Sequence, residues 1–171
     1  NNIVVNSNQN FDANLNKVFF NDLGIKKPNY NFTINKKSSS SQKISNFILS
    51  MEKILLKEKP DAVIYLGDTN TCYSLIPVKK FKIPIFHFEA GNRCFDERVP
   101  EEVNRRFTDH ISDINLVYSE HARRNLISEG IDKYRIIKTG SPMLEVINEN
   151  INKIEKSNIL NKLYLKKKNL Y

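Results

Sequence analysis

Short apolar runs alternate with segments of helical periodicity along most of the chain. The apolar runs have the length of strands, and the segments between them place apolar residues three or four positions apart, as amphipathic helices do. Strands are predicted at residues 3–5, 30–34, 62–66, 83–88, 114–117 and 135–138, and helices near residues 12–22, 41–58, 71–80, 100–111, 120–128 and 143–156. This β-α-β-α order predicts an α/β fold with a doubly wound parallel sheet.

Two acidic residues directly follow predicted buried strands. Asp68 comes after the run that ends at Leu66, and Glu89 after the run that ends at Phe88. Ligands of open parallel sheets bind beyond the carboxyl ends of the strands, and a carboxylate held there, partly desolvated, suits proton transfer. Asp68 also fits a helix N-cap, since an Asp before a helix accepts its free N–H groups. Glu89 precedes an Ala-Gly turn and has no capping duty, so the pair predicts acid–base chemistry.

The sequence PEEVNR at residues 100–105 predicts a helix start, with a proline in its first turn and acids that favour the helix dipole. Glu101 and Arg105 are four residues apart and could form a surface ion pair. The short loop after Glu89 favours a functional role instead, because it returns Glu101 to the edge of the sheet. Arg93 and Arg98 in that loop could bind a phosphate or another acid through paired hydrogen bonds.

The histidines and cysteines carry weaker signals. His87 lies within a predicted buried strand, where a satisfied core histidine is favoured over a group that supports the site. His110 and His121 lie on predicted helices in solvated or capping positions. Cys72 and Cys94 have no neighbouring base that would activate a thiol, and their spacing fits no zinc motif. We therefore expect no structural metal and a reducing compartment.

The composition is that of an ordinary globular domain, with 171 residues, 40% of them hydrophobic and 27% charged. The formal net charge of +8 would suit a nucleic-acid surface, but the excess lies in scattered lysines and in the Lys-rich stretch near the end of the sequence. We expect no nucleic-acid partner and no membrane partner, since the sequence shows neither an apolar span of about 20 residues nor a signal peptide. A cytoplasmic protein with an anionic small substrate fits these features. With five glycines, scattered, the chain also has no Gly-rich phosphate loop.

Four motifs in order carry a family resemblance. They are Gly67-Asp68-Thr69, the HFEAGNR stretch at residues 87–93, the PEEVNR stretch at residues 100–105, and Thr139-Gly140-Ser141-Pro142. Together they resemble the non-hydrolysing UDP-N-acetylglucosamine 2-epimerase family over nearly the whole chain. The stretches 91–96 and 98–102 are most similar to the branch that makes UDP-N-acetyl-L-fucosamine.

The resemblance implies two Rossmann-like halves, as in GT-B glycosyltransferases, with the sugar nucleotide bound between them. Residues 1–141 would be most of the N-terminal half, and residues 142–171 a helix and tail leading toward a UDP-binding second domain. The implied reaction inverts C2 of a UDP-N-acetyl sugar by elimination and re-addition of UDP, for surface polysaccharide precursors such as those of capsule. It requires no cofactor and no metal, and the complete enzyme would be a homodimer.

The resemblance also implies roles for individual residues. Matching positions make Asp68, Glu89 and Glu101 the catalytic acids, without deciding which removes the proton and which returns it. The implied substrate-binding residues are Gln9, Arg93 and Arg105.

The sequence departs from the family pattern at both ends. The family's first strand and Gly-Thr-Arg-Pro-Glu turn would lie before residue 1, and Ser7-Asn8 stand where Thr-Gly is usual. We therefore expect this chain alone to be inactive. Two alternatives remain at this point, a non-catalytic binding or regulatory module with the same fold, and half of a GT-B glycosyltransferase.

Overall fold

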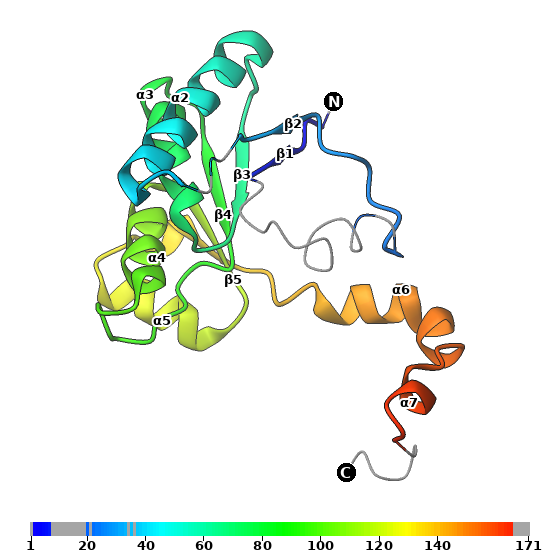
Figure 1. The fold of residues 1–171 in the computed structure, drawn as a ribbon. Coiled ribbons are helices and arrows are strands. Elements are labelled where there is room, and N and C mark those ends of the chain that lie inside the picture. The colour runs from blue at the N-terminus through cyan, green and yellow to red at the C-terminus, as the bar shows by residue number, and fades with distance from the viewer. Residues whose placement is uncertain (1, 8–19, 21, 34, 36, 166–171) are drawn as a thin grey trace. The chain divides into compact units, whose positions relative to one another are not determined.

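The computed structural model describes residues 2–7, 20, 22–33, 35 and 37–165 (Figure 1). The chain divides into two compact units, Asn1–Thr139 and Gly140–Tyr171. The domain boundary expected after residue 141 lies two residues beyond this division. Each unit is described by itself below.

A four-stranded parallel sheet organises the first unit. Its strands are β3 (Val63–Leu66), β4 (Ile85–Phe88), β5 (Ile114–Val117) and β6 (Ile136–Lys138), and they pair in sequence order. Val63 pairs with Ile85, Phe86 with Ile114, and Leu116 with Ile137. The parallel sheet of an α/β, Rossmann-like fold is confirmed.

The beginning of the chain departs more from the prediction. β1 (Val5–Asn6) and β2 (Tyr30–Asn31) form a separate two-stranded parallel sheet, and both are shorter than the predicted strands. The helix expected near residues 12–22 lies almost entirely outside the described residues.

The helices start and stop where local chemistry dictates. α2 (Ser40–Glu58) begins at a capping box, in which Ser39 accepts from the Gln42 N–H and the Gln42 side chain accepts from the Ser39 N–H. α4 (Pro100–Ile111) begins with its proline, and Ser119 caps α5 (Glu120–Ser128). The bounds of α4 and β5 are those expected. The second unit contains α6 (Met143–Glu155) and α7 (Ile159–Lys162).

The single helix predicted at residues 71–80 is wrong. The chain instead forms a 3₁₀ helix, η2 (Asn70–Ser74), followed by α3 (Leu75–Lys80). Pro77 explains the break, because it has no N–H to donate to the carbonyl of Tyr73 and is tolerated only in the first turn of a new helix. A second 3₁₀ helix, η3 (Lys133–Arg135), precedes β6.

Two hydrophobic clusters fix the helices against one face of the sheet. The first comprises residues of α2, α3 and β4 with Phe32, namely Phe32, Phe47, Met51, Ile54, Leu55, Leu75, Val78 and Ile85. The second joins α5 to β5 and β6 through residues that include Val117, Leu126 and Ile136. α2, α3 and α4 lie along the same side of β3 and β4 (Figure 1).

The opposite face of the sheet carries apolar side chains that are exposed in the described part of the chain. Ile64 and Leu66 of β3 are 69% and 62% exposed, and Ile137 of β6 is 49% exposed. The second helical layer that a doubly wound sheet requires stays a prediction.

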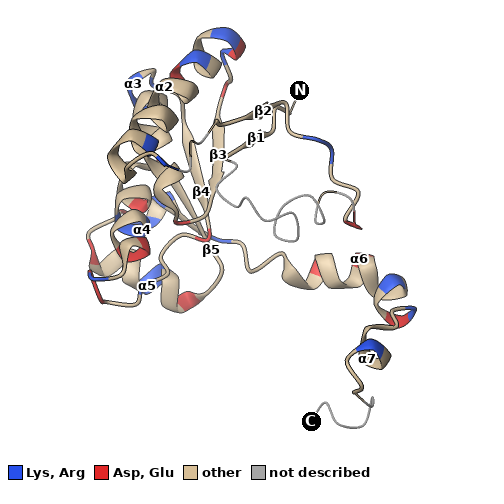
Figure 2. Cartoon of the chain, viewed as in Figure 1, with Lys and Arg blue, Asp and Glu red and all other residues tan. Residues whose placement is uncertain are grey.

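The described helices show neither a surface of clustered basic residues that would bind a nucleic acid nor a span that would cross a membrane. Basic and acidic residues are mixed on α2, α4 and α5 (Figure 2). Within the residues that the structure describes, none of the helices combines the length and apolarity that crossing a membrane requires.

The two free cysteines should differ sharply in reactivity. Cys72 in η2 is fully buried, and burial raises the pKa of its thiol to about 12, whereas Cys94 is exposed. Because the thiolate is the reactive form, we expect iodoacetamide at pH 8 to alkylate Cys94 in the folded chain and to reach Cys72 only after unfolding. Intact mass and peptide mapping measure this directly. Equal labelling of both thiols in the native protein would contradict the buried position of η2.

Candidate functional site

The two predicted acids leave the sheet side by side. Leu66 pairs in register with Phe88, so β3 and β4 end at the same level. Asp68 follows β3 through Gly67, whose φ of +115° turns the chain, and Glu89 follows β4 directly. Both acids border one hollow of about 10 Å³, room for about one water molecule, and it is also bordered by Gly67, His87, Asn92 and Arg105. The structure therefore joins Asp68, Glu89 and Arg105 in one site.

Two residues of helix α4 hold Asp68 in place beyond the end of β3. Arg105 donates to Asp68 Oδ2 from Nε at 3.0 Å and from Nη2 at 2.8 Å. Asn104, which is 3% exposed, donates to the carbonyl oxygen of Asp68 at 2.9 Å. The N-cap residue of η2 is Thr69, so the interpretation of Asp68 as a helix cap is wrong. Asp68 is instead a carboxylate paired with a half-buried cation.

The turn that carries Glu89 has an unusual backbone. Glu89 has a φ of +66°, in the left-handed region that non-glycine residues rarely adopt. Gly91, with a φ of +81°, lies so close to α5 that a Cβ atom there would be 2.4 Å from the carbonyl oxygen of Ala122. Asn125 of α5 donates to the Gly91 carbonyl oxygen at 3.0 Å. Packing against α5 thus holds the acid in a conformation that costs about 1–3 kcal/mol.

A buried carboxylate, Asp109 of α4, ties this turn to the sheet. Its side chain is fully buried, and its two oxygens accept from the Gly91 N–H at 3.3 and 3.2 Å. The same carboxylate lies 2.8 Å from Nδ1 of His87 and 2.7 Å from Nη1 of Arg93. Three groups, on β4, on the turn and on the loop after it, therefore converge on one carboxylate.

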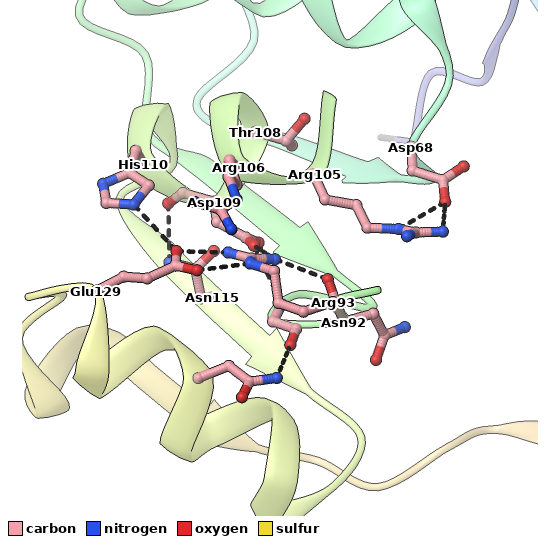
Figure 3. A network of polar contacts seen from close by, with 12 residues as sticks. Asp68, Asn92, Arg93, Arg105, Arg106, Thr108, Asp109, His110, Asn115 and Glu129 are labelled. Carbon is pink, nitrogen blue, oxygen red and sulfur yellow. Dashed lines mark hydrogen bonds and ion pairs between the residues drawn. The ribbon is translucent and has the colours of Figure 1, made fainter. Parts of the chain in front are cut away.

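Arg93 lies within this network and does not face the hollow. Its guanidinium is fully buried and donates from Nε and Nη2 to the two oxygens of Glu129, each at 2.7 Å (Figure 3). Burial disfavours its charge, but the hydrogen bonds to Glu129 and Asp109 outweigh that effect and raise the pKa of Arg93. A direct substrate contact would require one of these carboxylates to be displaced. His110 Nε2 lies 3.2 Å from Glu129 at the outer end of the network.

Glu101 and Glu102 open α4 with different environments. Glu102 is fully buried and accepts from the Cys94 N–H at 2.9 Å. Burial opposes its ionisation, yet this hydrogen bond, with others from Cys94 and Arg106, lowers the pKa of Glu102. Glu101 is half-buried and has no ion pair with any described residue, so the alternative of a surface pair between Glu101 and Arg105 is wrong. Arg105 is turned to Asp68 instead.

The other residues predicted for the site do not border this hollow in the part of the chain that the structure describes. Glu101 and Arg93 are not among the residues that border the hollow. Arg98 is exposed and pairs with Asp96 in its own loop, and Gln9 lies outside the described residues. A larger hollow of about 300 Å³ lies near Tyr30 and Lys57, away from the carboxyl ends of β3 and β4. Its acid is Glu58, which accepts a hydrogen bond from Tyr30.

Reasoning from sequence missed the buried polar face of α4. Residues 102, 104, 108 and 109 are Glu, Asn, Thr and Asp, and all four are buried. Glu102 and Asp109 are seven residues apart and Asn104 and Thr108 four apart, so each pair shares one side of the helix. A helix with so few apolar residues was a signal of a functional role that the sequence alone offered. Asn92, which donates to Glu89 at 3.4 Å, was missed as well. Among the described residues, no group of three metal-ligand side chains is placed to hold a metal ion.

Comparison with known proteins shows which family this chain resembles. The family model described as UDP-N-acetylglucosamine 2-epimerase matches residues 1–171. A UDP-N-acetylglucosamine 2-epimerase of Methanocaldococcus jannaschii is 38% identical over 155 residues, which are 90% of this chain and 42% of that protein. A UDP-2,3-diacetamido-2,3-dideoxy-D-glucuronate 2-epimerase of Pseudomonas aeruginosa is 40% identical over 82% of this chain and 40% of its own length.

Solved structures agree with the fold. The UDP-N-acetylglucosamine 2-epimerase of Rickettsia bellii is 51% identical, with a TM-score of 0.86 over 96% of this chain and 44% of that one. The M. jannaschii enzyme in complex with UDP-GlcNAc and UDP is 36% identical, with a TM-score of 0.85 over 94% of this chain and 44% of that one. This chain therefore spans less than half the length of these relatives.

The pair between Arg93 and Glu129 should make the protein sensitive to acid. The hydrogen bond from Arg93 is the main cause that lowers the pKa of Glu129, so its stabilisation is present above the pKa of an unfolded glutamate and is lost as the pH falls through the lowered value. We expect Glu129→Gln to lower the free energy of unfolding at pH 7 by about 1.5–3 kcal/mol. Urea unfolding at several pH values measures the difference, which should shrink as the pH falls below about 4.

Glu120→Gln is a suitable control. Glu120 also pairs with arginines of its helix, but on the surface, where such pairs are worth about 0–1 kcal/mol. Equal losses in the two variants would show that the buried pair is no stronger than a surface one.

Proposed function

The chain belongs to the UDP-N-acetylglucosamine 2-epimerase family, and we propose that it carries the acid–base residues of an enzyme that inverts C2 of a UDP-2-acetamido sugar. One observation carries the proposal: Asp68 and Glu89 border the same hollow at adjoining strand ends, with Arg105 beside them. Two carboxylates fixed by a rigid sheet suit a reaction that removes one proton and returns another.

The proposed reaction has two stages. A carboxylate takes the proton from C2, the electron pair of that bond forms a C1–C2 double bond, and the C1–O bond breaks as UDP leaves with its electrons. A carboxylic acid then delivers a proton to the other face of C2, and the UDP oxygen attacks C1. Substrate and product have the same atoms, so the reaction consumes no oxidant, reductant or metal.

We assign the two proton transfers to Asp68, Glu89 and Glu101 as a set. Asp68 and Glu89 border the hollow, and Glu101 is half-buried at the start of α4 without an ion pair among the described residues. Arg105 is the proposed cation of the site, since it borders the hollow and stands against Asp68. The burial of Arg93 between two carboxylates supports a positioning role in place of a substrate contact. Gln9 stays a proposed substrate contact from the family resemblance.

The relatives support a proposal for the substrate class. One solved relative holds UDP-GlcNAc and UDP, and another relative is named for a UDP-diacetamido sugar acid. We propose a UDP-N-acetylhexosamine for this chain, used for surface polysaccharide precursors. The branch that makes UDP-N-acetyl-L-fucosamine stays the specific prediction.

More than half of the length of each of these relatives lies outside the region that matches this chain. We propose that such residues supply the grip on UDP, as the second half of a GT-B fold would, and that the complete enzyme is a cytoplasmic homodimer.

Removing any one of the three acids should slow turnover strongly in the protein expressed from its complete reading frame. Asp68→Asn, Glu89→Gln and Glu101→Gln keep the size of each side chain but remove its ability to exchange a proton. We expect kcat to fall by about 10²–10⁴-fold, while wild type incorporates deuterium at C2 of the sugar in heavy water. Proton NMR of UDP-N-acetylglucosamine incubated with each variant measures both effects.

Glu97→Gln is the matched control, because Glu97 lies in the same acidic loop with a side chain that is 74% exposed. It should retain full activity. Sugar transfer to an acceptor without exchange at C2 would indicate a glycosyltransferase, and a cellular effect that survives all three amide substitutions would indicate a binding module.

The 171-residue chain by itself should bind UDP weakly and should not turn over UDP-N-acetyl sugars. The reason is that the acids alone cannot hold UDP so that its bond to C1 is aligned for elimination as C2 loses its proton. Isothermal titration with UDP and the heavy-water assay test the two parts. Exchange at C2 catalysed by this chain alone would contradict the proposed need for further residues.

A further inference from the structure

We propose that His87 is a substrate-contacting residue of this site, whose Nε2 accepts a hydrogen bond from the sugar of the UDP-sugar. This inference rests on the proposed function and adds to it a hydrogen-bond acceptor in the hollow that the two carboxylates border. His87 is the third residue of β4, and it borders the same hollow as Asp68 and Glu89. Its side chain is only 2% exposed.

Asp109 determines which ring nitrogen carries the proton. The Asp109 carboxylate faces donors on its other sides, the N–H of Gly91 and the guanidinium of Arg93. It is therefore an acceptor toward His87 as well, and the 2.8 Å contact with Nδ1 requires the hydrogen on Nδ1. In the neutral ring Nε2 then has a free lone pair.

Nε2 has no hydrogen-bond partner in the part of the chain that the structure describes. The ring is fixed nonetheless, by Asp109 at Nδ1 and by Tyr65, whose ring centroid lies 5.9 Å from that of His87. Among the described residues, the fully buried side-chain atoms without a partner are Ser74 Oγ and Asn115 Oδ1. Nε2 is not one of them, so it keeps access to the hollow that His87 borders. A ligand in the hollow would satisfy this nitrogen.

The charge of the surroundings selects the part of the ligand that meets Nε2. A diphosphate offers only acceptors, which a lone pair repels. Of the charged groups that border the hollow, Arg105 is paired with Asp68, and Glu89 adds a negative charge. A hydroxyl or an amide N–H is a donor and meets no such repulsion. The sugar with its acetamido group carries both, so it is the sugar and not the diphosphate that the geometry places against His87.

His87→Asn separates this role from the structural one. The Asn side-chain amide can occupy the position of Nδ1 and donate to Asp109, whereas the acceptor at Nε2 is lost. In the protein expressed from its complete reading frame, we expect kcat/KM for UDP-N-acetylglucosamine to fall about ten-fold, mainly through a higher KM. A purely structural loss would reduce the active fraction, and so kcat, without raising KM. His121→Asn, an exposed histidine on α5, should behave as wild type.

Nitrogen NMR tests the tautomer independently of activity. In protein with ¹⁵N-labelled histidine, the resonances that disappear in His87→Asn belong to His87. We expect Nδ1 to carry the hydrogen, and we expect the Nε2 resonance to shift when UDP-N-acetylglucosamine is added but not when UDP alone is added.

The outcomes separate the inference from the proposed function. A hydrogen on Nε2 in place of Nδ1, an Nε2 shift with UDP alone, or an active wild type whose His87→Asn variant has an unchanged KM overturns the inference and leaves the epimerase proposal standing. A wild type that neither exchanges C2 nor turns over any UDP-N-acetyl sugar overturns the proposed function and the inference with it.

Discussion

The arrangement of the site depends on one buried charge, the carboxylate of Asp109. A fully buried carboxylate is tolerable only when donors surround it, and here the donors are the Gly91 N–H, the His87 ring and the Arg93 guanidinium. These groups belong to β4, to the turn after it and to the loop beyond, so compensating the charge fixes all three segments against α4. The positions of Glu89 and His87 are thus a consequence of electrostatics in the core.

α4 therefore has two separate roles. Its buried polar residues join the sheet to the loop, and Arg105 on the same helix reaches Asp68 at the end of β3. The adjacent acids Glu101 and Glu102 belong to different roles. Glu102 accepts a hydrogen bond from the loop backbone at Cys94, whereas Glu101 has no ion pair among the described residues. A helix that both builds the scaffold and presents charged groups couples the stability of this region to its chemistry.

The sequence predicted what local patterns determine and failed where distant partners decide. The bounds of α4 and β5 and the strand-end positions of Asp68 and Glu89 followed from periodicity, and Pro77 could have shown that residues 71–80 do not form one helix. The sequence could not show which carboxylate each arginine pairs with. Arg93 pairs with Glu129, 36 residues away, and Arg105 with Asp68, 37 residues away, because the fold brings those carboxylates closer than any neighbour in the chain. His87 is buried, as the favoured interpretation as a core histidine predicted, but its partner Asp109, 22 residues away, could not be read from the strand pattern.

The left-handed backbone at Glu89 has a consequence for how such sequences diverge. At this position the backbone alone favours glycine, and only a need for the carboxylate opposes it. A gene copy released from that need would gain stability by losing the acid, while α5 and the Gly91 contact preserved the turn. A glycine in the place of Glu89 would then be the mark of a descendant that retains the fold and has abandoned the chemistry.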